Sequence, residues 1–276
     1  MTDHQLPIST GFVEVDGGQL HYEVAGKGQP LILLQENGLV DKRIWDYQFL
    51  TFAHHYRVIR YDQRGYGQSL SSKKPYTAVD DLAQILQTLN IESAYLLALG
   101  AGLALDFVHA HASSVDAIIL VSPEINPHQS FDEAMADLPT ILERLAPAIE
   151  AVKQNDMQRA TDLVIQDLML PSSANYQWVR NIVAKNFQAV LNPPLPPSVD
   201  INAFSSRHQW YKEIHVPTLL LIGDSARSEI QSSTVSLEKT IPGAQKREIS
   251  RARYLLNAEQ VEQFNRAALD FLSAIK

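Results

Sequence analysis

The chain reads Tyr61-Asp62-Gln63-Arg64-Gly65-Tyr66-Gly67-Gln68-Ser69 at the end of a short apolar run that begins at Arg57. Two glycines in nine residues indicate a sharp turn after a buried strand, because glycine adopts backbone angles that other residues avoid. The stretch lacks the Gly-Lys-Ser/Thr ending with which a glycine-rich loop holds a nucleotide phosphate. We therefore expect a strand and a tight turn here, and no nucleotide site.

Outward from this turn, short apolar runs alternate with longer helical patterns. Several runs are apolar throughout, as expected for strands that are covered on both faces of a parallel sheet. The runs that fit strands are Phe12–Val15, Leu20–Val24, Leu31–Leu34, Arg57–Tyr61, Tyr95–Ala98, Ala117–Val121, Thr218–Ile222 and Lys246–Ile249. This order predicts an α/β fold with a mostly parallel, eight-stranded sheet and helices on both of its faces.

Helical patterns fill most of the remaining chain. Those between the strands lie at Tyr47–Phe52, Val79–Leu89, Gly102–Ala110, Ser232–Thr240 and Glu259–Ile275. From about residue 125 to residue 212, in contrast, only helical patterns occur, at Phe131–Arg144, Met157–Leu170 and Tyr176–Val190. We predict a core formed by residues 1–123 and 213–276, with residues 124–212 inserted as a helical cap. Helices above the carboxyl edge of a sheet typically form the outer wall of a pocket.

Composition excludes several classes of function. The 276 residues contain no cysteine, which rules out disulfides, a thiol nucleophile and cysteine-based metal sites. The net charge of −8, without a run of basic residues, argues against nucleic-acid binding. The N-terminus lacks the layout of a signal peptide, and the apolar runs are far shorter than the roughly 20 residues of a membrane helix. We expect a cytoplasmic protein that uses no cofactor and no metal and has no membrane partner.

Several stretches together resemble the α/β-hydrolase fold family. Residues 61–69 match its Y-D-x-R-G-x-G-x-S segment, and Ile44-Trp45-Asp46 and Ile91–Tyr95 are typical of it. The same holds for Asn257–Gln260, which leads into the last helix. The resemblance covers nearly the whole chain, is weakest in the cap, and points to the branch of esterases, enol-lactonases and cofactor-free haloperoxidase-like members. It implies the fold and says little about chemistry.

The resemblance assigns each position of a catalytic triad to a residue of this chain. The family's nucleophile lies in G-x-S-x-G on a turn between strand and helix, and the matching stretch, residues 98–102, has Gly100 at that position. The position of the acid corresponds to Ala226, and that of the histidine to Tyr254. Conventional serine hydrolysis is therefore not expected, because it needs a nucleophile, a base and a group that orients the base.

Two glutamates, together with Tyr254, are candidates for acid–base chemistry. Counting back from Trp45 places Glu36 at the histidine position of the family's oxyanion loop, with Gln35 as the alternative. A carboxylate beside an oxyanion hole opposes the negative charge that the hole stabilises. Glu36, Tyr254 and Glu124 come from loops that meet at one pocket in this fold, and burial raises the pKa of a glutamate toward that of a useful base. The competing interpretation pairs Glu36 with Arg251 or Arg253 in a salt bridge.

A set of neighbours of these loops is predicted to contact a ligand. It consists of Gln35, Asn37, Gly38, Gly100, Ala101, Trp178 and Arg253. Three hypotheses follow. The first is a degenerate hydrolase homologue that binds a small, largely apolar molecule beneath the cap. The second is a cofactor-independent lyase, isomerase, cyclase or decarboxylase that uses Glu36 and Tyr254. The third is a protein-interaction role without a ligand. The sequence names no ligand and leaves the oligomeric state open.

Overall fold

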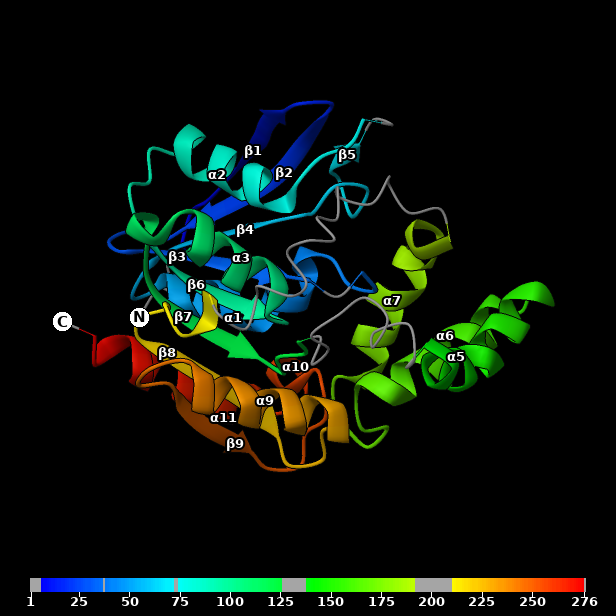
Figure 1. Cartoon of the computed structure of the whole chain (residues 1–276). Coiled ribbons are helices and arrows are strands. Elements are labelled where there is room, and N and C mark those ends of the chain that lie inside the picture. The colour runs from blue at the N-terminus through cyan, green and yellow to red at the C-terminus, as the bar shows by residue number, and fades with distance from the viewer. Residues whose placement is uncertain (1–5, 37, 72–73, 126–137, 192–209, 276) are drawn as a thin grey trace, which may run out of the picture.

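A computed structural model describes residues 6–36, 38–71, 74–125, 138–191 and 210–275. Its centre is one sheet (Figure 1), in which the first strands pair antiparallel and all pairs from β4 onward are parallel. In spatial order the strands are β1 (Ile8–Val15), β2 (Gly18–Ala25), β4 (Arg57–Tyr61), β3 (Pro30–Gln35), β6 (Ala94–Leu99), β7 (Val115–Val121), β8 (Thr218–Gly223) and β9 (Gln245–Ile249). This confirms the predicted eight strands; a further short strand, β5 (Leu70–Ser71), pairs with β2 and was not predicted.

Helices cover both faces of the sheet, because alternate side chains of each buried strand point to opposite faces. On β3, Leu31 and Leu33 belong to one hydrophobic cluster and Ile32 and Leu34 to another. The first cluster includes residues of helices α1 (Asp46–Ala53), α10 (Leu256–Glu259) and α11 (Val261–Ser273), and the second includes residues of α2 (Ala78–Thr88) and α3 (Gly102–Ala110). Helix α9 (Ser228–Thr240) contributes to both clusters. Two short 3-10 helices, η1 (Lys42–Trp45) and η2 (Ala112–Ser114), complete the core.

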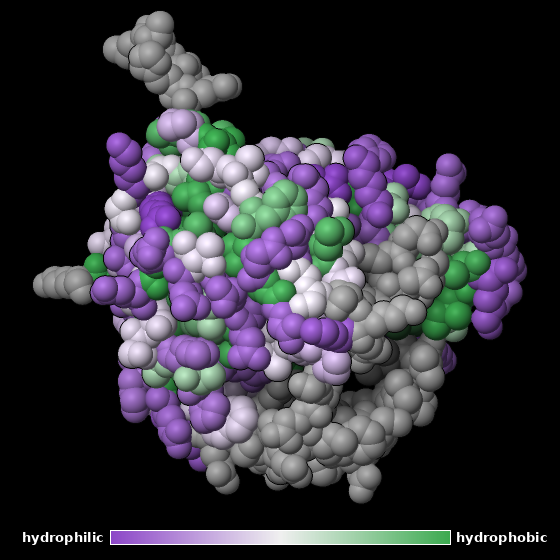
Figure 2. Space-filling view, turned by 90° about the horizontal axis from the view of Figure 1, so that it is seen from above, coloured by the Kyte–Doolittle hydropathy of each residue, from purple (hydrophilic) through white to green (hydrophobic). Residues whose placement is uncertain are grey.

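The outer surface of these layers is mixed in character. Hydrophilic and hydrophobic side chains are interspersed over the face seen in Figure 2. The edge strand β9 exposes charged side chains, which discourage pairing with another chain. None of the helices in the described ranges is long and apolar enough to cross a membrane.

Three cap helices lie beyond one end of the sheet (Figure 1): α5 (Leu138–Lys153), α6 (Met157–Leu168) and α7 (Tyr176–Leu191). The prediction of a helix at Phe131–Arg144 was wrong at its end, since α5 continues to Lys153; residues 131–137 lie outside the described residues. The predicted last helix, Glu259–Ile275, corresponds to α11, which begins two residues later because the backbone at Gln260 (φ −132°, ψ 61°) leaves helical angles between α10 and α11. The boundaries of the cap remain a prediction.

The turn at residues 61–69 is organised around the buried carboxylate of Asp62. That carboxylate accepts hydrogen bonds from the backbone and the ammonium group of Lys42, at 3.0 and 2.8 Å, and from the backbone of Gln68 at 3.0 Å. The backbone of Gly67 (φ +53°) lies so close that an added Cβ would be 2.2 Å from Asp62 Oδ2. A glycine is required here by both its backbone angles and the close approach of Asp62.

The substitution Gly67→Ala should therefore lower the free energy of unfolding by at least about 3 kcal/mol, since it adds left-handed strain and displaces a buried ion pair. Gly243→Ala is the matched control, because Gly243 also has a positive φ (+73°) but an added Cβ there meets nothing within 4 Å. The control should lose only about 1–2 kcal/mol. Urea titration of both variants measures the difference, and equal losses would contradict the role assigned to Asp62.

Candidate functional site

The predicted turn between strand and helix is present at Gly100, between β6 and α3. Gly100 has a φ of +109°, and its N–H donates a hydrogen bond of 2.9 Å to the carbonyl of Val121 at the end of β7. The next residue, Ala101, is buried and precedes the first turn of α3 without a side chain that caps it. The turn directs the N-terminus of α3 to the carboxyl edge of the sheet, and glycine adopts its left-handed angles without strain.

The side chain of Glu36 lies against Gly100. The backbone N–H of Glu36 donates to the carbonyl of Leu99 at 3.0 Å, which holds the loop after β3 beside the turn. A Cβ added to Gly100 would lie 3.0 Å from Cβ and 3.2 Å from Oε2 of Glu36. These distances are shorter than ordinary van der Waals contacts. The side chain of Glu36 therefore borders the space that a side chain at residue 100 would need.

The carboxyl group of Glu36 also faces the first turn of α3. The N–H of Ala104 lies 3.4 Å from Oε1. Burial raises the pKa of Glu36 from 4.5 to about 7, while the backbone N–H groups of Leu103, Ala104 and Gly102 act in the opposite direction. Glu36 thus supplies to α3 the cap that Ala101 cannot. No ion pair among the described residues includes Glu36, so the expected partner Arg251 or Arg253 is not found there.

From the raised pKa of Glu36 we predict how the free energy of unfolding depends on pH. The folded chain holds this proton more tightly than the unfolded chain, so the contribution of Glu36 to stability is fully present below about pH 4.5 and falls by about 3 kcal/mol as the pH rises through 7. Glu36→Gln removes this loss because it cannot ionise. Between pH 5 and pH 8 the melting temperature of the wild type should fall several degrees further than that of the variant, as thermal scanning would detect.

A control for this comparison is Glu262→Gln, which removes an exposed carboxylate from α11. It should follow the wild type at both pH values. If Glu36→Gln also follows the wild type, the protonation of Glu36 is not coupled to folding.

The positions matched to the family's histidine and acid, Tyr254 and Ala226, lie on loops at the same edge of the sheet. Tyr254 is buried, and its N–H donates to the carbonyl of Leu168 in the cap at 3.0 Å. The hydroxyl of Ser122, after β7, donates to the carbonyl of Tyr254 at 2.8 Å. Ala226 is buried after β8. These contacts join the loop after β9 to β7 on one side and to the cap on the other.

Asp224, two residues before Ala226, positions the same loop. Its carboxylate accepts hydrogen bonds from the backbone N–H groups of Arg251 at 2.8 Å and Ala252 at 3.3 Å. These hydrogen bonds lower the pKa of Asp224, and the one from Arg251 contributes most. The residue therefore holds loop 250–253 in place as a permanent carboxylate at neutral pH.

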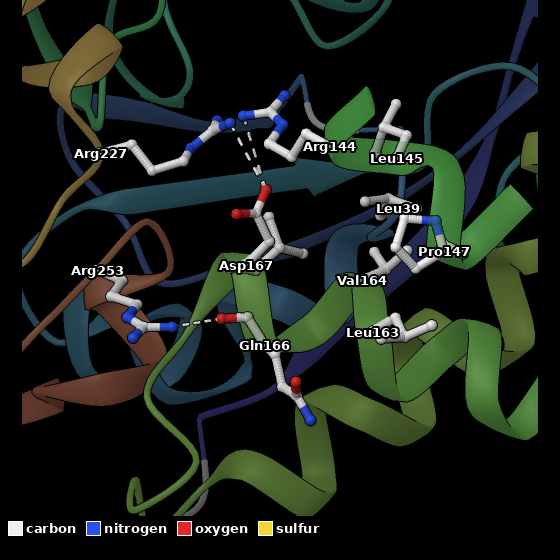
Figure 3. Close-up of a pocket in the computed structure, with 12 residues that line it drawn as sticks. Leu39, Arg144, Leu145, Pro147, Leu163, Val164, Gln166, Asp167, Arg227 and Arg253 are labelled. Atoms are coloured by element: carbon white, nitrogen blue, oxygen red, sulfur yellow. Dashed lines mark hydrogen bonds and ion pairs between the residues drawn. The ribbon is translucent and has the colours of Figure 1, made fainter. Parts of the chain in front are cut away.

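A cavity of about 480 Å³ lies between the cap and these loops (Figure 3), and we call it the arginine cavity. One part of its wall is charged and another part is apolar. Its lining residues are Leu39, Arg144, Leu145, Pro147, Ala148, Leu163, Val164, Gln166, Asp167, Leu168, Arg227 and Arg253. The volume falls in the range of roughly 300–1,000 Å³ typical of small-molecule sites.

Asp167 joins two of the arginines across this cavity. Its Oδ2 lies 3.8 Å from Nη1 of Arg144 on α5 and 3.5 Å from Nη1 of Arg227 in the loop after β8. Glu124 is 3.3 Å from Nη2 of Arg227, and burial raises the pKa of Glu124 while Arg144 opposes the shift. Arg253 donates to the backbone carbonyl of Gln166.

The predicted site residues are thus divided among different surroundings. Arg253 lines the arginine cavity; Glu36, Glu124 and Tyr254 are not among its lining residues. Glu36 faces Gly100 and α3, whereas Glu124 faces Arg227. Arg144, Asp167 and Arg227 were not singled out from the sequence. The only hint was the place of Arg227, directly after the position matched to the family's acid.

Two of the remaining predicted ligand contacts, Gln35 and Trp178, have structural partners. Gln35 is buried and donates its amide to the carbonyl of Tyr61 at 2.6 Å. The ring of Trp178 packs edge to face on Tyr47, with centroids 4.9 Å apart. A Cβ on Gly38 would lie 2.8 Å from the hydroxyl of Tyr66, and Asn37 lies outside the described residues. No group of three potential metal-binding side chains occurs within the part of the chain that is described.

Comparison with known families agrees with this architecture. The family described as alpha/beta hydrolase fold matches residues 32–253, which is most of the chain. The chain belongs to the α/β-hydrolase fold family. The match begins within β3, includes the turn at Gly100 and helices α5, α6 and α7, and ends at Arg253, one residue before Tyr254.

Relatives of this α/β hydrolase carry several different names. A provisionally named non-heme chloroperoxidase from Synechocystis sp. is 24% identical over 275 residues, covering 92% of this chain and 94% of its own. The carboxylesterase CesB from Bacillus subtilis has 21% identity and a TM-score of 0.76, over 96% of this chain and 92% of its own. The enol-lactonase from Burkholderia xenovorans has 21% identity and a TM-score of 0.74, over 95% and 100%. The two structural likenesses establish the fold alone.

Proposed function

We propose that this α/β hydrolase binds a small, largely apolar molecule beneath its cap and does not act by serine hydrolysis. The observation that supports this most directly is at Gly100. The position matched to the family's nucleophile has no side chain, and the side chain of Glu36 packs against it. The matched acid and histidine positions are Ala226 and Tyr254, which are a poor orienting group and a poor base at neutral pH.

The arginine cavity favours a bound ligand over a role in protein interaction alone. A cavity of about 480 Å³ remains open between α5, α6 and the core loops, and part of its wall is apolar. Concave pockets of this size with apolar walls are typical of small-molecule sites. Native mass spectrometry of the purified protein is expected to detect a co-purified molecule that organic solvent releases.

A fluorophosphonate probe tests the absence of a serine nucleophile. The wild type should remain unlabelled and should not hydrolyse a panel of esters. The triple variant Gly100→Ser, Ala226→Asp and Tyr254→His should gain little, because the new serine meets Glu36. Adding Glu36→Gly clears that contact and should allow labelling and measurable esterase activity. Hydrolysis by the wild type that the probe abolishes would overturn the proposal.

A second function, non-hydrolytic acid–base catalysis, is favoured by one specific feature. Burial raises the pKa of Glu36 to about 7, and a general base works best when its pKa is near the operating pH. Glu36 would take a proton from the substrate, and Tyr254 would polarise it by donating a hydrogen bond. The reaction classes that fit are those needing no nucleophile: elimination, isomerisation, cyclisation and decarboxylation.

For any such activity, the rate should rise with pH through about 7, because Glu36 must be ionised to accept a proton. Glu36→Gln should abolish turnover, and Tyr254→Phe should reduce it by about a hundredfold or more, the range of general acid–base effects. The exposed variant Glu262→Gln serves as the control. Steady-state rates across pH 5–9 measure these effects, and full activity in both Glu36→Gln and Tyr254→Phe would refute the mechanism.

A further inference from the structure

The arginine cavity carries more positive than negative charge. Its lining contains Arg144, Arg227 and Arg253 but a single carboxylate, Asp167. In Figure 3, the side chains of Arg144 and Arg227 come from opposite sides and their guanidinium groups converge on that carboxylate. At 3.8 and 3.5 Å these separations are longer than the 2.7–2.9 Å of a close charge-assisted hydrogen bond. Asp167 therefore lies near both guanidinium groups but forms a close hydrogen bond with neither.

Arg227 retains unused hydrogen-bonding capacity. Its Nε is buried and has no hydrogen-bond partner within the described part of the chain. Glu124 approaches only the terminal Nη2, at 3.3 Å, and is not part of the cavity lining. An unsatisfied buried donor is energetically unfavourable, and more so when the group is charged. A ligand oxygen that accepts from Arg227 would remove this cost.

The wall next to the arginines is apolar and suits the rest of such a ligand. Leu145 of α5 and Leu163 and Val164 of α6 line it, and Figure 3 shows them on the side away from Arg227 and Arg253. Leu145 is exposed and the other two are only partly buried, so their side chains have apolar surface still open to solvent. The cavity thus places a cationic end and an apolar end within one small volume.

We propose that the arginine cavity binds a small amphipathic carboxylic acid, with the carboxylate at Arg144 and Arg227 and the hydrocarbon body against Leu145, Leu163 and Val164. The planar guanidinium group pairs with a planar carboxylate through two parallel hydrogen bonds, which an alcohol or an ester cannot reproduce. One bound monoanion also lowers the net charge of the lining from +2 to +1. This inference rests on the proposed function, since it names the class of molecule that binds beneath the cap.

Octanoate and 1-octanol, titrated by calorimetry against the full-length protein, test this assignment. They share a chain length and differ in the charged end. Octanoate should bind at least tenfold more tightly than octanol, which is the lower end of what a charge-assisted hydrogen bond contributes. Inorganic phosphate, an anion without an apolar body, should bind more weakly than octanoate. Raising the salt concentration should lower the affinity for octanoate only modestly, because the site is partly buried.

Three variants locate the binding site. Arg227→Gln and Arg144→Gln should each weaken octanoate about tenfold or more and leave octanol unchanged. Asp167→Asn should strengthen octanoate, because it removes the carboxylate that competes for both arginines; a purely structural ion pair would not produce this gain. Arg159→Gln is the matched control, since Arg159 is exposed on the same helix α6 and does not line the cavity.

The outcomes separate this inference from the proposed function. Equal affinity for octanol and octanoate, or no effect of the arginine variants, would overturn the carboxylate assignment and leave a site for apolar molecules intact. Absence of binding by octanoate would also overturn it. Ester hydrolysis by the wild type, blocked by the fluorophosphonate, would overturn the proposed function, whatever the affinities. If Arg227→Gln unfolds, circular dichroism will reveal it, and Asp167→Asn still decides the question.

Discussion

The contact between Glu36 and Gly100 is the constraint on which the site depends. The turn from β6 into α3 needs a positive φ at Gly100, and the absence of a Cβ lets the loop after β3 approach. That approach places a carboxyl group over the N-terminus of α3, where backbone N–H groups and burial act on its pKa in opposite directions. A Cβ at residue 100 would lie 3.0 Å from Cβ and 3.2 Å from Oε2 of Glu36, so the side chain of Glu36 would have to shift by a few tenths of an ångström to admit it.

A second layer of interactions connects the cap to the core. Asp167 of α6 lies between Arg144 of α5 and Arg227 of the core, and Arg253 reaches the carbonyl of Gln166. The backbone of Tyr254 is bonded to the cap at Leu168. The same side chains therefore position the cap and line the arginine cavity. A ligand that engages these arginines would act directly on the attachment of the cap to the sheet.

Most of the fold was predictable from local patterns. All eight predicted strands are present, because strands buried on both faces are continuous apolar runs and leave a strong signal in the sequence. The two-residue strand β5 is too short to have such a signal. The backbone break at Gln260 lies beside the predicted start of the last helix, and periodicity alone does not fix a helix boundary to within two residues. The glycine at the position matched to the family's nucleophile, Gly100, was also recognisable in the sequence, because the surrounding turn is a local motif.

The sequence by itself determined which residues occupy the turn, the acid position and the histidine position, since each lies within a short motif beside a strand. Only the tertiary structure decided what they face. Glu36 meets α3 instead of an arginine, and Arg144 and Arg227, 83 positions apart, meet at one aspartate. The physical reason is that strand and turn patterns arise from the preferences of neighbouring residues, whereas a cavity between cap and core depends on how distant elements pack. No local pattern encodes that packing.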